Sequence, residues 1–178
     1  MSGHSKWSKI KRKKEGTDAE KSKVFSKMAR LIATASRQAK GDVNSPVLRA
    51  AIDKAREYNM PADNIERAVK KGSDPGTQNL ESITYESYGP GGSALIIEAL
   101  TSNRNKATQE VKFILSKYRF ELAAPHAASW AFRRDPTTHD LQPTATVKIS
   151  EADSKTLEKL IEELEDNEEV QEVYTNAE

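Results

Sequence analysis

The spacing of apolar residues changes once along this chain, and that change limits what the chain can fold into. Before Gly72, apolar residues recur every three or four positions, which is the spacing of an amphipathic helix. After residue 79 they gather into short runs rich in β-branched and aromatic residues, which are typical of strands. The residues between are turn formers with no large apolar side chain. We therefore predict an α+β protein with a helical domain over residues 1–72, a linker over 73–79 and a second domain over 80–178.

Three short helices are expected in the first domain. The first carries an apolar stripe and ends near Gly41. The second opens with Ser45, a capping residue, and Pro46, a first-turn proline, and runs toward Tyr58. The third follows a break in the pattern and stops at Gly72. Together they predict an N-terminal three-helix bundle.

The second domain contains five expected strands and two expected helices. After a leading strand, the elements follow the order βαββαβ. With right-handed crossovers, this order gives a ferredoxin-like sheet with two helices on one face. The expected strands are 83–88, 94–100, 128–132, 145–149 and 170–174, and the expected helices are 104–118 and 154–166.

Charge is divided unevenly across the same boundary. The chain has a net charge of +1, but residues 1–72 hold 18 Lys and Arg against 8 Asp and Glu, and the rest hold 10 against 19. The two parts therefore carry +10 and −9, and the basic part indicates a polyanionic partner. Residues 1–14 form a basic arm with six cations and no acid, which could serve only for solubility or could bind phosphates. Further cations off the first apolar stripe could extend such a surface: Lys21, Lys23, Lys27, Arg30, Arg37 and Lys40.

No group of residues in the sequence is typical of catalysis, a metal site or a cofactor site. The three histidines lack the spacing of helical metal ligands, and cysteine is absent. Residues 89–92 are rich in glycine, as phosphate-binding loops are, but they link two expected strands, so we interpret them as a tight β connection. We expect neither an enzyme nor a metal or cofactor.

Residues 148–178 hold 11 acids against 3 lysines. We interpret this acidic run as a solvated face, although it could also repel nucleic acid or meet a basic protein. No segment has the 18 apolar residues of a membrane span, and the N-terminus lacks the apolar core of a secretory signal. A cytoplasmic protein without a membrane partner is expected, and its oligomeric state is not predicted.

The two tryptophans each have alternative roles. Trp7 lies in the basic arm, where it could stack on a base or anchor the arm to the first helix, and we favour the anchor. Trp130 and Phe132 alternate onto one face of an expected strand, as aromatic residues that stack on RNA would. A sheet face covered by helices needs the same residues for its core, so we predict that both are buried.

Several stretches of the sequence resemble the YebC/PmpR family, and they occur in the same order. The resemblance covers nearly all of residues 1–132 and returns near the C-terminus. The stretches include Gly3-His4-Ser5-Lys6-Trp7, Asn59-Met60-Pro61, Asp63-Asn64-Ile65-Glu66-Arg67-Ala68, Lys70-Lys71-Gly72, Tyr88-Gly89-Pro90-Gly91-Gly92 and Asn103-Arg104-Asn105.

This resemblance implies a non-enzymatic DNA-binding transcriptional regulator, with relatives, including a mitochondrial translational activator, that act on the ribosome. DNA and ribosomal RNA are therefore alternative partners, and a basic protein bound by the acidic domain is a third alternative. The family positions, with Arg12 and Lys13 of the arm, predict nucleic-acid contacts at His4, Lys6, Trp7, Lys9, Lys11, Arg12, Lys13, Lys14, Lys54, Met60, Asp63, Asn64, Arg67, Lys70 and Lys71. Family members usually carry a further domain where this chain has only residues 133–144, so the resemblance implies a short form.

Overall fold

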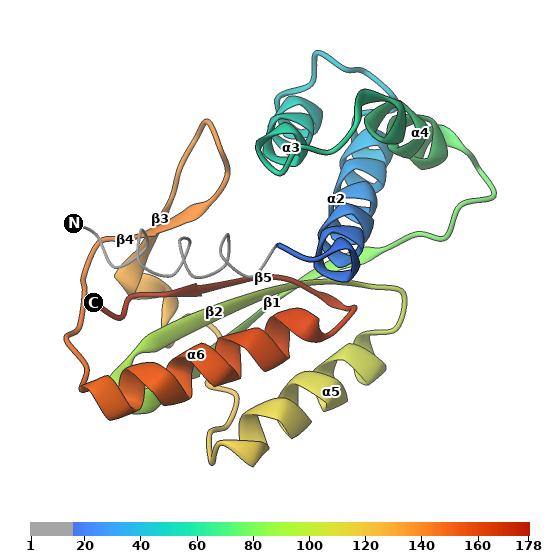
Figure 1. Cartoon of the computed structure of the whole chain (residues 1–178). Coiled ribbons are helices and arrows are strands. Elements are labelled where there is room, and N and C mark those ends of the chain that lie inside the picture. The colour runs from blue at the N-terminus through green and yellow to red at the C-terminus, as the bar shows by residue number, and fades with distance from the viewer. Residues whose placement is uncertain (1–15) are drawn as a thin grey trace. The chain divides into compact units, whose positions relative to one another are not determined.

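A computed structural model describes residues 16–178 of the chain. Helices α2, α3 and α4 form one compact unit, and all the strands form another together with helices α5 and α6 (Figure 1). The predicted α+β class is confirmed, because helices come first and a domain of sheet and helices follows.

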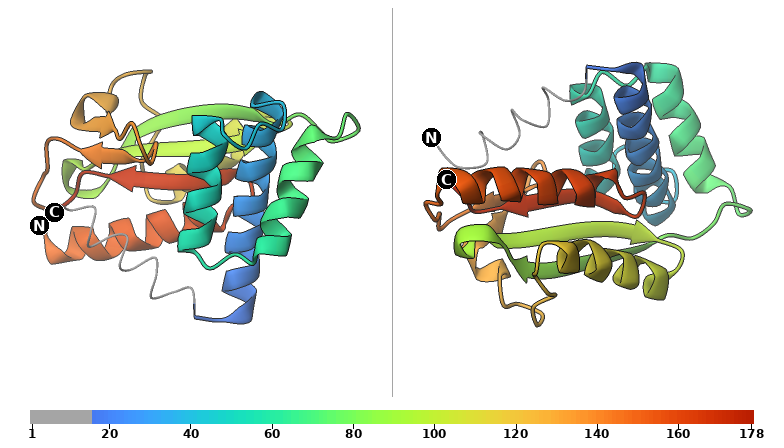
Figure 2. Two further views of the ribbon diagram at one scale, coloured as in Figure 1. Left: turned by 90° about the horizontal axis from the view of Figure 1, so that it is seen from above. Right: turned by 60° about the horizontal axis from the view of Figure 1, so that its bottom comes forward.

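The helical unit consists of α2 (Asp18–Gln38), α3 (Pro46–Glu57) and α4 (Ala62–Ser73). Helix α2 begins with a capping box, in which Thr17 and Glu20 each accept a hydrogen bond from the backbone N–H of the other. It lies between α3 and α4 and contacts both (Figure 2). The core between the three helices contains Met28, Ile32, Leu48, Ala51, Ala55, Met60, Ile65 and Ala68.

Helices α2 and α3 both end in a Schellman motif. Helix α2 ends at Gln38, near Gly41 as predicted; Lys40 has the left-handed φ of 52°, and the N–H of Gly41 donates to the carbonyl of Ser36 at 2.9 Å. After α3, Asn59 has a positive φ of 60°, and the N–H of Met60 donates to the carbonyl of Ala55 at 3.0 Å. Asparagine tolerates this left-handed conformation better than most residues. The motif turns the chain so that Met60 enters the core.

The prediction that α4 stops at Gly72 is wrong, because the helix runs to Ser73 and Gly72 lies inside it. A Cβ atom at position 72 would lie only 2.3 Å from the backbone oxygen of Ala33 and 2.7 Å from the Cβ of Ser36. Both of these residues belong to α2, and the Ser36 hydroxyl donates to the carbonyl of Val69 at 2.7 Å. Gly72 therefore permits the close contact of two helices and does not reverse the chain.

The second unit is built on an antiparallel sheet of β1 (Glu81–Tyr88), β2 (Ala94–Thr101) and β5 (Val170–Thr175), in the order β1-β2-β5. Helices α5 (Arg104–Lys117) and α6 (Glu151–Asp166) cover one face of this sheet (Figure 2). The larger core residues on that face are Ile83, Leu95, Ile97, Val111, Leu115, Leu157, Leu160, Leu164, Val170 and Val173.

Two expected strands differ from those in the structure. Within 128–132, the short 3-10 helix η2 (Ser129–Ala131) precedes β3 (Phe132–Arg134). β3 pairs with β4 (Leu141–Pro143) as a separate hairpin, so it does not join the main sheet. Residues 145–149 contain a single bridge, from Val147 to Ala177.

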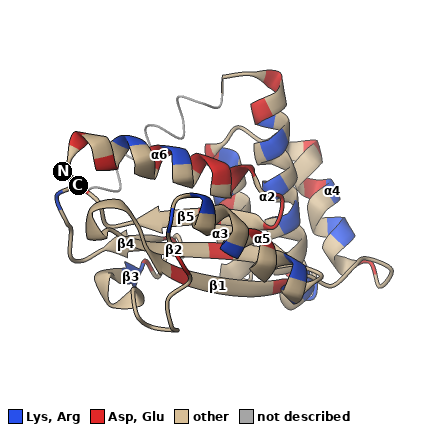
Figure 3. Cartoon of the chain, turned by 90° about the horizontal axis from the view of Figure 1, so that it is seen from below, with Lys and Arg blue, Asp and Glu red and all other residues tan. Residues whose placement is uncertain are grey.

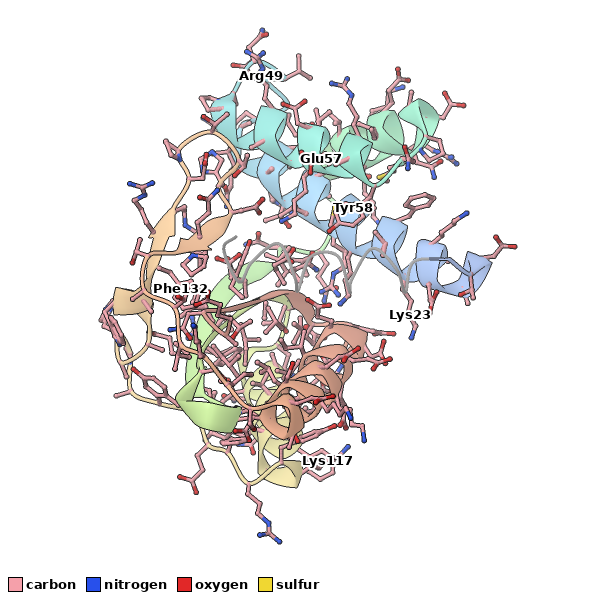
Figure 4. The ribbon with its side chains drawn as sticks, turned by 60° about the vertical axis from the view of Figure 1, so that its left-hand side comes forward. Lys23, Arg49, Glu57, Tyr58, Lys117 and Phe132 are labelled. Carbon is pink, nitrogen blue, oxygen red and sulfur yellow. The ribbon has the colours of Figure 1, made fainter. Side chains whose placement is uncertain are left out.

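The reason for this difference is the packing of small residues on the second face of the sheet. Ala128 and Ala131 are both fully buried, and their spacing of three residues suits a helical turn better than a strand. They pack with Ile96 and Tyr174 of the sheet. Phe132, labelled in Figure 4, packs against the same cluster.

The loop between α5 and β3 is held on this second face by Glu86 of β1. The Glu86 side chain is only 8% exposed, and its carboxylate accepts backbone N–H bonds from His126, Ala128 and Ser129 at 2.5, 3.0 and 2.6 Å. Burial alone would raise the pKa of Glu86, but these donors together lower it below its ordinary value. The carboxylate therefore stays ionised and fixes the loop backbone.

The predicted tight connection between the first two strands is confirmed. β1 and β2 are joined by η1 (Pro90–Gly92), where Gly91 and Gly92 have φ values of 68° and 77°. A Cβ at Gly91 would lie 2.6 Å from Cγ2 of Ile149, whereas a Cβ at Gly92 would meet no atom within 4 Å.

These two glycines provide a matched test of close packing at the turn. We expect Gly92→Ala to lower the free energy of unfolding by about 1 kcal/mol, because alanine is strained at positive φ. Gly91→Ala has the same strain and must also displace Ile149, so it should lose about 2 kcal/mol more. Urea unfolding of both variants measures the difference, and equal losses would show that the Ile149 contact is unimportant.

Candidate nucleic-acid interface

The predicted contacts in the basic arm lie outside the described residues. They are His4, Lys6, Trp7, Lys9, Lys11, Arg12, Lys13 and Lys14. The remaining predicted contacts lie in α3, in α4 and in the connection between them.

Helix α4 brings three of the predicted residues onto one exposed face. Lys70 and Lys71 follow Arg67 by three and four residues, and all three are exposed, so their side chains leave the helix on the same side. The opposite side of the helix carries the buried Ile65 and Ala68. The three cations and their helix form a surface that we call the α4 cationic face, and Figure 3 shows Lys and Arg on this helix.

Two further predicted residues position Arg67 on this face. The guanidinium of Arg67 donates to Oδ1 of Asn64 at 2.6 Å and to the backbone carbonyl of Asp63 at 3.3 Å. These bonds hold the guanidinium along the helix surface, so less side-chain freedom is lost when it binds an anion. Asp63 and Asn64 therefore hold the Arg67 guanidinium in position in this structure.

Lys54 and Met60 lie in different surroundings from the α4 cationic face. Lys54 is half-buried on α3, and Met60 is 6% exposed within the bundle core. The structure thus gives Met60 a packing role. A signal for its burial is present in the sequence, because it follows an asparagine that ends a helix and precedes a proline.

A second group of cations follows the side of α2 that is turned away from the core. Lys23, Lys27 and Arg30 recur at spacings of four and three, opposite Met28 and Ile32. Figure 3 shows Lys and Arg at intervals along this helix, and Figure 4 labels Lys23. Of the six cations that could extend a basic surface, these three share one side of α2.

Arg37 has a different role from the other cations of α2. Its guanidinium donates to the backbone carbonyl of Thr77 at 2.7 Å, and the Thr77 hydroxyl donates to the carbonyl of Lys71 at 2.7 Å. Together these bonds hold the segment after α4 against the helical unit. Arg37 is therefore left out of the proposed binding residues.

Within the sheet unit, one prediction about an aromatic residue is wrong. Trp130 was expected in the core, but its side chain is 62% exposed, while Phe132 is half-buried. Trp130 lies in η2, and its Nε1–H donates to the hydroxyl of Tyr88 at 2.9 Å. Sequence periodicity alone could not show this, because the strand on which the prediction relied does not include residue 130.

The acidic residues of the sheet unit gather on α6. Glu158, Glu162 and Glu165 lie on the side of the helix away from its buried leucines. Glu163 differs, because it accepts hydrogen bonds from Lys117 and from the hydroxyl of Tyr118 on the α5 side. Acidic and basic residues thus link α6 to α5, while further carboxylates line the outer side of α6.

In the part of the chain that the structure describes, no group of three or more His, Asp or Glu residues could hold a metal ion. No helix among residues 16–178 is both long enough and apolar enough to cross a membrane.

Family models match almost the whole chain. Residues 5–75 match the TACO1/YebC protein N-terminal domain, and residues 80–139 and 135–177 match the TACO1/YebC second and third domain. The first match contains the α4 cationic face, and the second contains Glu86 and Trp130.

Individual relatives are similar over the full chain or over most of it. A "Probable transcriptional regulatory protein" of Fervidobacterium nodosum is 35% identical over 99% of this chain and 93% of its own length. One of Borrelia turicatae is 50% identical over 75% of this chain and 56% of its own. The crystal structure of a conserved hypothetical protein from Aquifex aeolicus has a TM-score of 0.77 and 28% identity, covering 90% of this chain and 91% of that one.

Proposed function

Because this chain belongs to the TACO1/YebC family, we propose that it is a regulatory protein that binds DNA through phosphate contacts of its basic helical unit. The observation that carries the proposal is the α4 cationic face, where Arg67, Lys70 and Lys71 are exposed together. The names of its relatives, probable transcriptional regulatory proteins, support a regulatory role, which is not an enzyme class.

Binding by such a surface depends on neutralising phosphate charge. Lysine and arginine side chains replace the cations condensed on DNA, and release of those cations provides most of the affinity. Contacts of this kind set the position of the protein on the duplex but do not read its sequence. If the six cations of the arm and the three of the α4 cationic face all bind phosphates, affinity should fall about ten-thousandfold or more between 50 and 200 mM salt.

Removing the α4 cationic face should weaken DNA binding and flatten its salt dependence. The variant Arg67→Ala/Lys70→Ala/Lys71→Ala loses three phosphate contacts, so the slope of log K against log salt should become shallower by about 3. At 0.1 M salt the affinity should fall about a hundredfold, to a similar extent for unrelated DNA sequences. Fluorescence anisotropy with a labelled duplex at several salt concentrations measures both quantities.

The matched control removes three exposed lysines from the sheet unit. Lys112→Ala/Lys155→Ala/Lys159→Ala changes the net charge by the same amount and should leave the slope close to that of the wild type. Lys70 and Lys71 lie in the last turn of α4, where their positive charges also stabilise the helix by interacting with its dipole. Circular dichroism must therefore show that both variants are folded. Equal weakening by the two variants would refute the proposed interface.

Ribosomal RNA is the alternative partner, because phosphate recognition by lysine and arginine serves either nucleic acid. Crosslinking in cells followed by sequencing of the bound nucleic acid decides between them. Recovery of chromosomal DNA supports the transcriptional role. Recovery of ribosomal RNA instead assigns the same surface to a translation factor, and either partner is consistent with the expected cytoplasmic location.

A further inference from the structure

Trp130 is exposed in a fixed position. The residue is 62% exposed, and the only polar hydrogen of its ring is already bonded to the Tyr88 hydroxyl. That hydroxyl in turn donates to the backbone carbonyl of Ala127 at 2.6 Å, so the indole is tied to the loop that carries it. What the side chain can still offer a ligand is the surface of its aromatic ring.

The backbone beneath the ring is also held in place. Glu86 fixes the N–H groups of His126, Ala128 and Ser129, and Ser129 directly precedes Trp130. A buried ionised carboxylate with three donors makes strong, charge-assisted hydrogen bonds. A ring presented on such a support loses little conformational entropy when a ligand binds to it.

The neighbours of Trp130 in the sequence are small, and the local charge is positive. Five of the nine residues over 123–131 are alanine. Residues 119–134 hold three arginines against one glutamate, within a part of the chain that carries −9 overall. Arg133 is exposed, whereas Arg134 is bound to Glu98 of β2 at 2.5 Å. An exposed aromatic residue and an exposed arginine three residues later therefore lie in a locally basic segment.

We propose that Trp130 is a stacking site for an unpaired nucleobase, and that Arg133 binds a phosphate of the same strand. A base needs only one ring face, and stacking on an aromatic side chain is tolerant of sequence. A protein partner would need about 800 Å² of interface on each side. Trp130 and the adjacent Tyr88 are exposed, but Ala128 and Ala131 are buried, so the exposed aromatic surface is too small for the apolar centre of such an interface. This inference rests on the proposed function, because both take a nucleic acid as the partner. Its new content is that the sheet unit binds a single, unpaired strand.

The fluorescence of Trp130 reports directly on stacking. In a Trp7→Phe background, Trp130 is the sole tryptophan, and all variants are compared in that background. A single strand of about 15 thymidines should quench its emission at 50 mM salt, and a blunt duplex of the same length should not. Trp130→Ala should weaken binding of the single strand about tenfold, while Trp130→Phe should retain most of the affinity.

Phe113 provides the matched control, because it is 63% exposed on α5 but has Lys117 over its ring, with Nζ 4.7 Å from the ring centroid. Phe113→Ala should bind the single strand as tightly as the background protein. Absence of quenching, or equal affinities for Trp130→Ala and Phe113→Ala, overturns the stacking site. If the protein binds duplex normally in that case, only this inference fails, whereas a wild-type protein, with Trp7 in place, that binds no nucleic acid at 50 mM salt refutes the proposed function as well.

Discussion

Replacing Gly72 with alanine is expected to destabilise the helical unit strongly. On an isolated helix this change would add about 1 kcal/mol of stability, because alanine favours the helix over glycine. In this structure the new methyl group would lie 2.3 Å from the backbone oxygen of Ala33, and a backbone atom cannot rotate away. Helices α2 and α4 must then separate along their contact, and we expect a loss of about 3 kcal/mol or more. Such a loss is a large part of the stability of a small helical unit.

Gly76→Ala is the matched control for this change. Its Cβ would have no contact closer than 3.4 Å, so the free energy of unfolding should change by less than about 1 kcal/mol. Ser36→Gly should not rescue Gly72→Ala, because the Ala33 carbonyl remains in place. Thermal unfolding followed by circular dichroism separates these outcomes. A Gly72→Ala variant as stable as the wild type would mean that α2 and α4 do not meet at this point.

Glu86→Gln is expected to release the loop that carries Trp130. The carboxylate accepts three buried backbone N–H groups, and a glutamine amide presents an NH₂ group where one of these donors requires an acceptor. We expect a loss of about 3 kcal/mol, because a buried donor left without a partner costs about 1–3 kcal/mol. Hydrogen exchange should show faster exchange of the amides of His126, Ala128 and Ser129.

The pH dependence of this effect has a definite sign. The pKa of Glu86 lies below its ordinary value of 4.5, because the backbone donors outweigh burial. The ionised form thus adds stability above pH 4.5, and this contribution is lost as the pH falls through the lowered pKa. The difference between wild type and Glu86→Gln should shrink in acid. Glu81→Gln, on the exposed end of the same strand, should lose less than about 1 kcal/mol at neutral pH, and a similar loss for both variants would contradict the anchoring role.

The helices of the first unit were predictable because local signals define them. Ser45 and Pro46 start α3 where expected, and Gly41 follows α2 in a Schellman motif. Gly72 was misjudged because glycine serves both chain reversal and close helix packing, and only the second helix distinguishes these roles. The sequence contains no sign of how near Ala33 would lie.

The sheet unit was predictable in class but not in every strand. β1, β2 and β5 have strand-forming residues and appear close to their expected positions. Ala128 and Ala131 are small enough for strand or helix, and their burial against Ile96 decides the outcome.

Spacing along a helix was sufficient to place Arg67, Lys70 and Lys71 on one face. The exposure of Trp130 was beyond such reasoning, because its partner Tyr88 lies 42 residues earlier in the chain. Contacts between residues this far apart in sequence depend on the whole fold. Periodicity therefore could not predict the surface formed by Trp130 and Tyr88, which come from two distant segments.

The anchoring of the loop by Glu86 has a consequence for sequence variation. The carboxylate binds main-chain N–H groups, and every residue except proline has one. The two positions nevertheless differ in the side chains they accept. His126 has a positive φ of 68°, which favours glycine, asparagine or aspartate, and the Ser129 side chain itself bonds to Glu86. A randomised library at position 126 should therefore keep the path of the loop with glycine, asparagine or aspartate and lose it with proline or a β-branched residue.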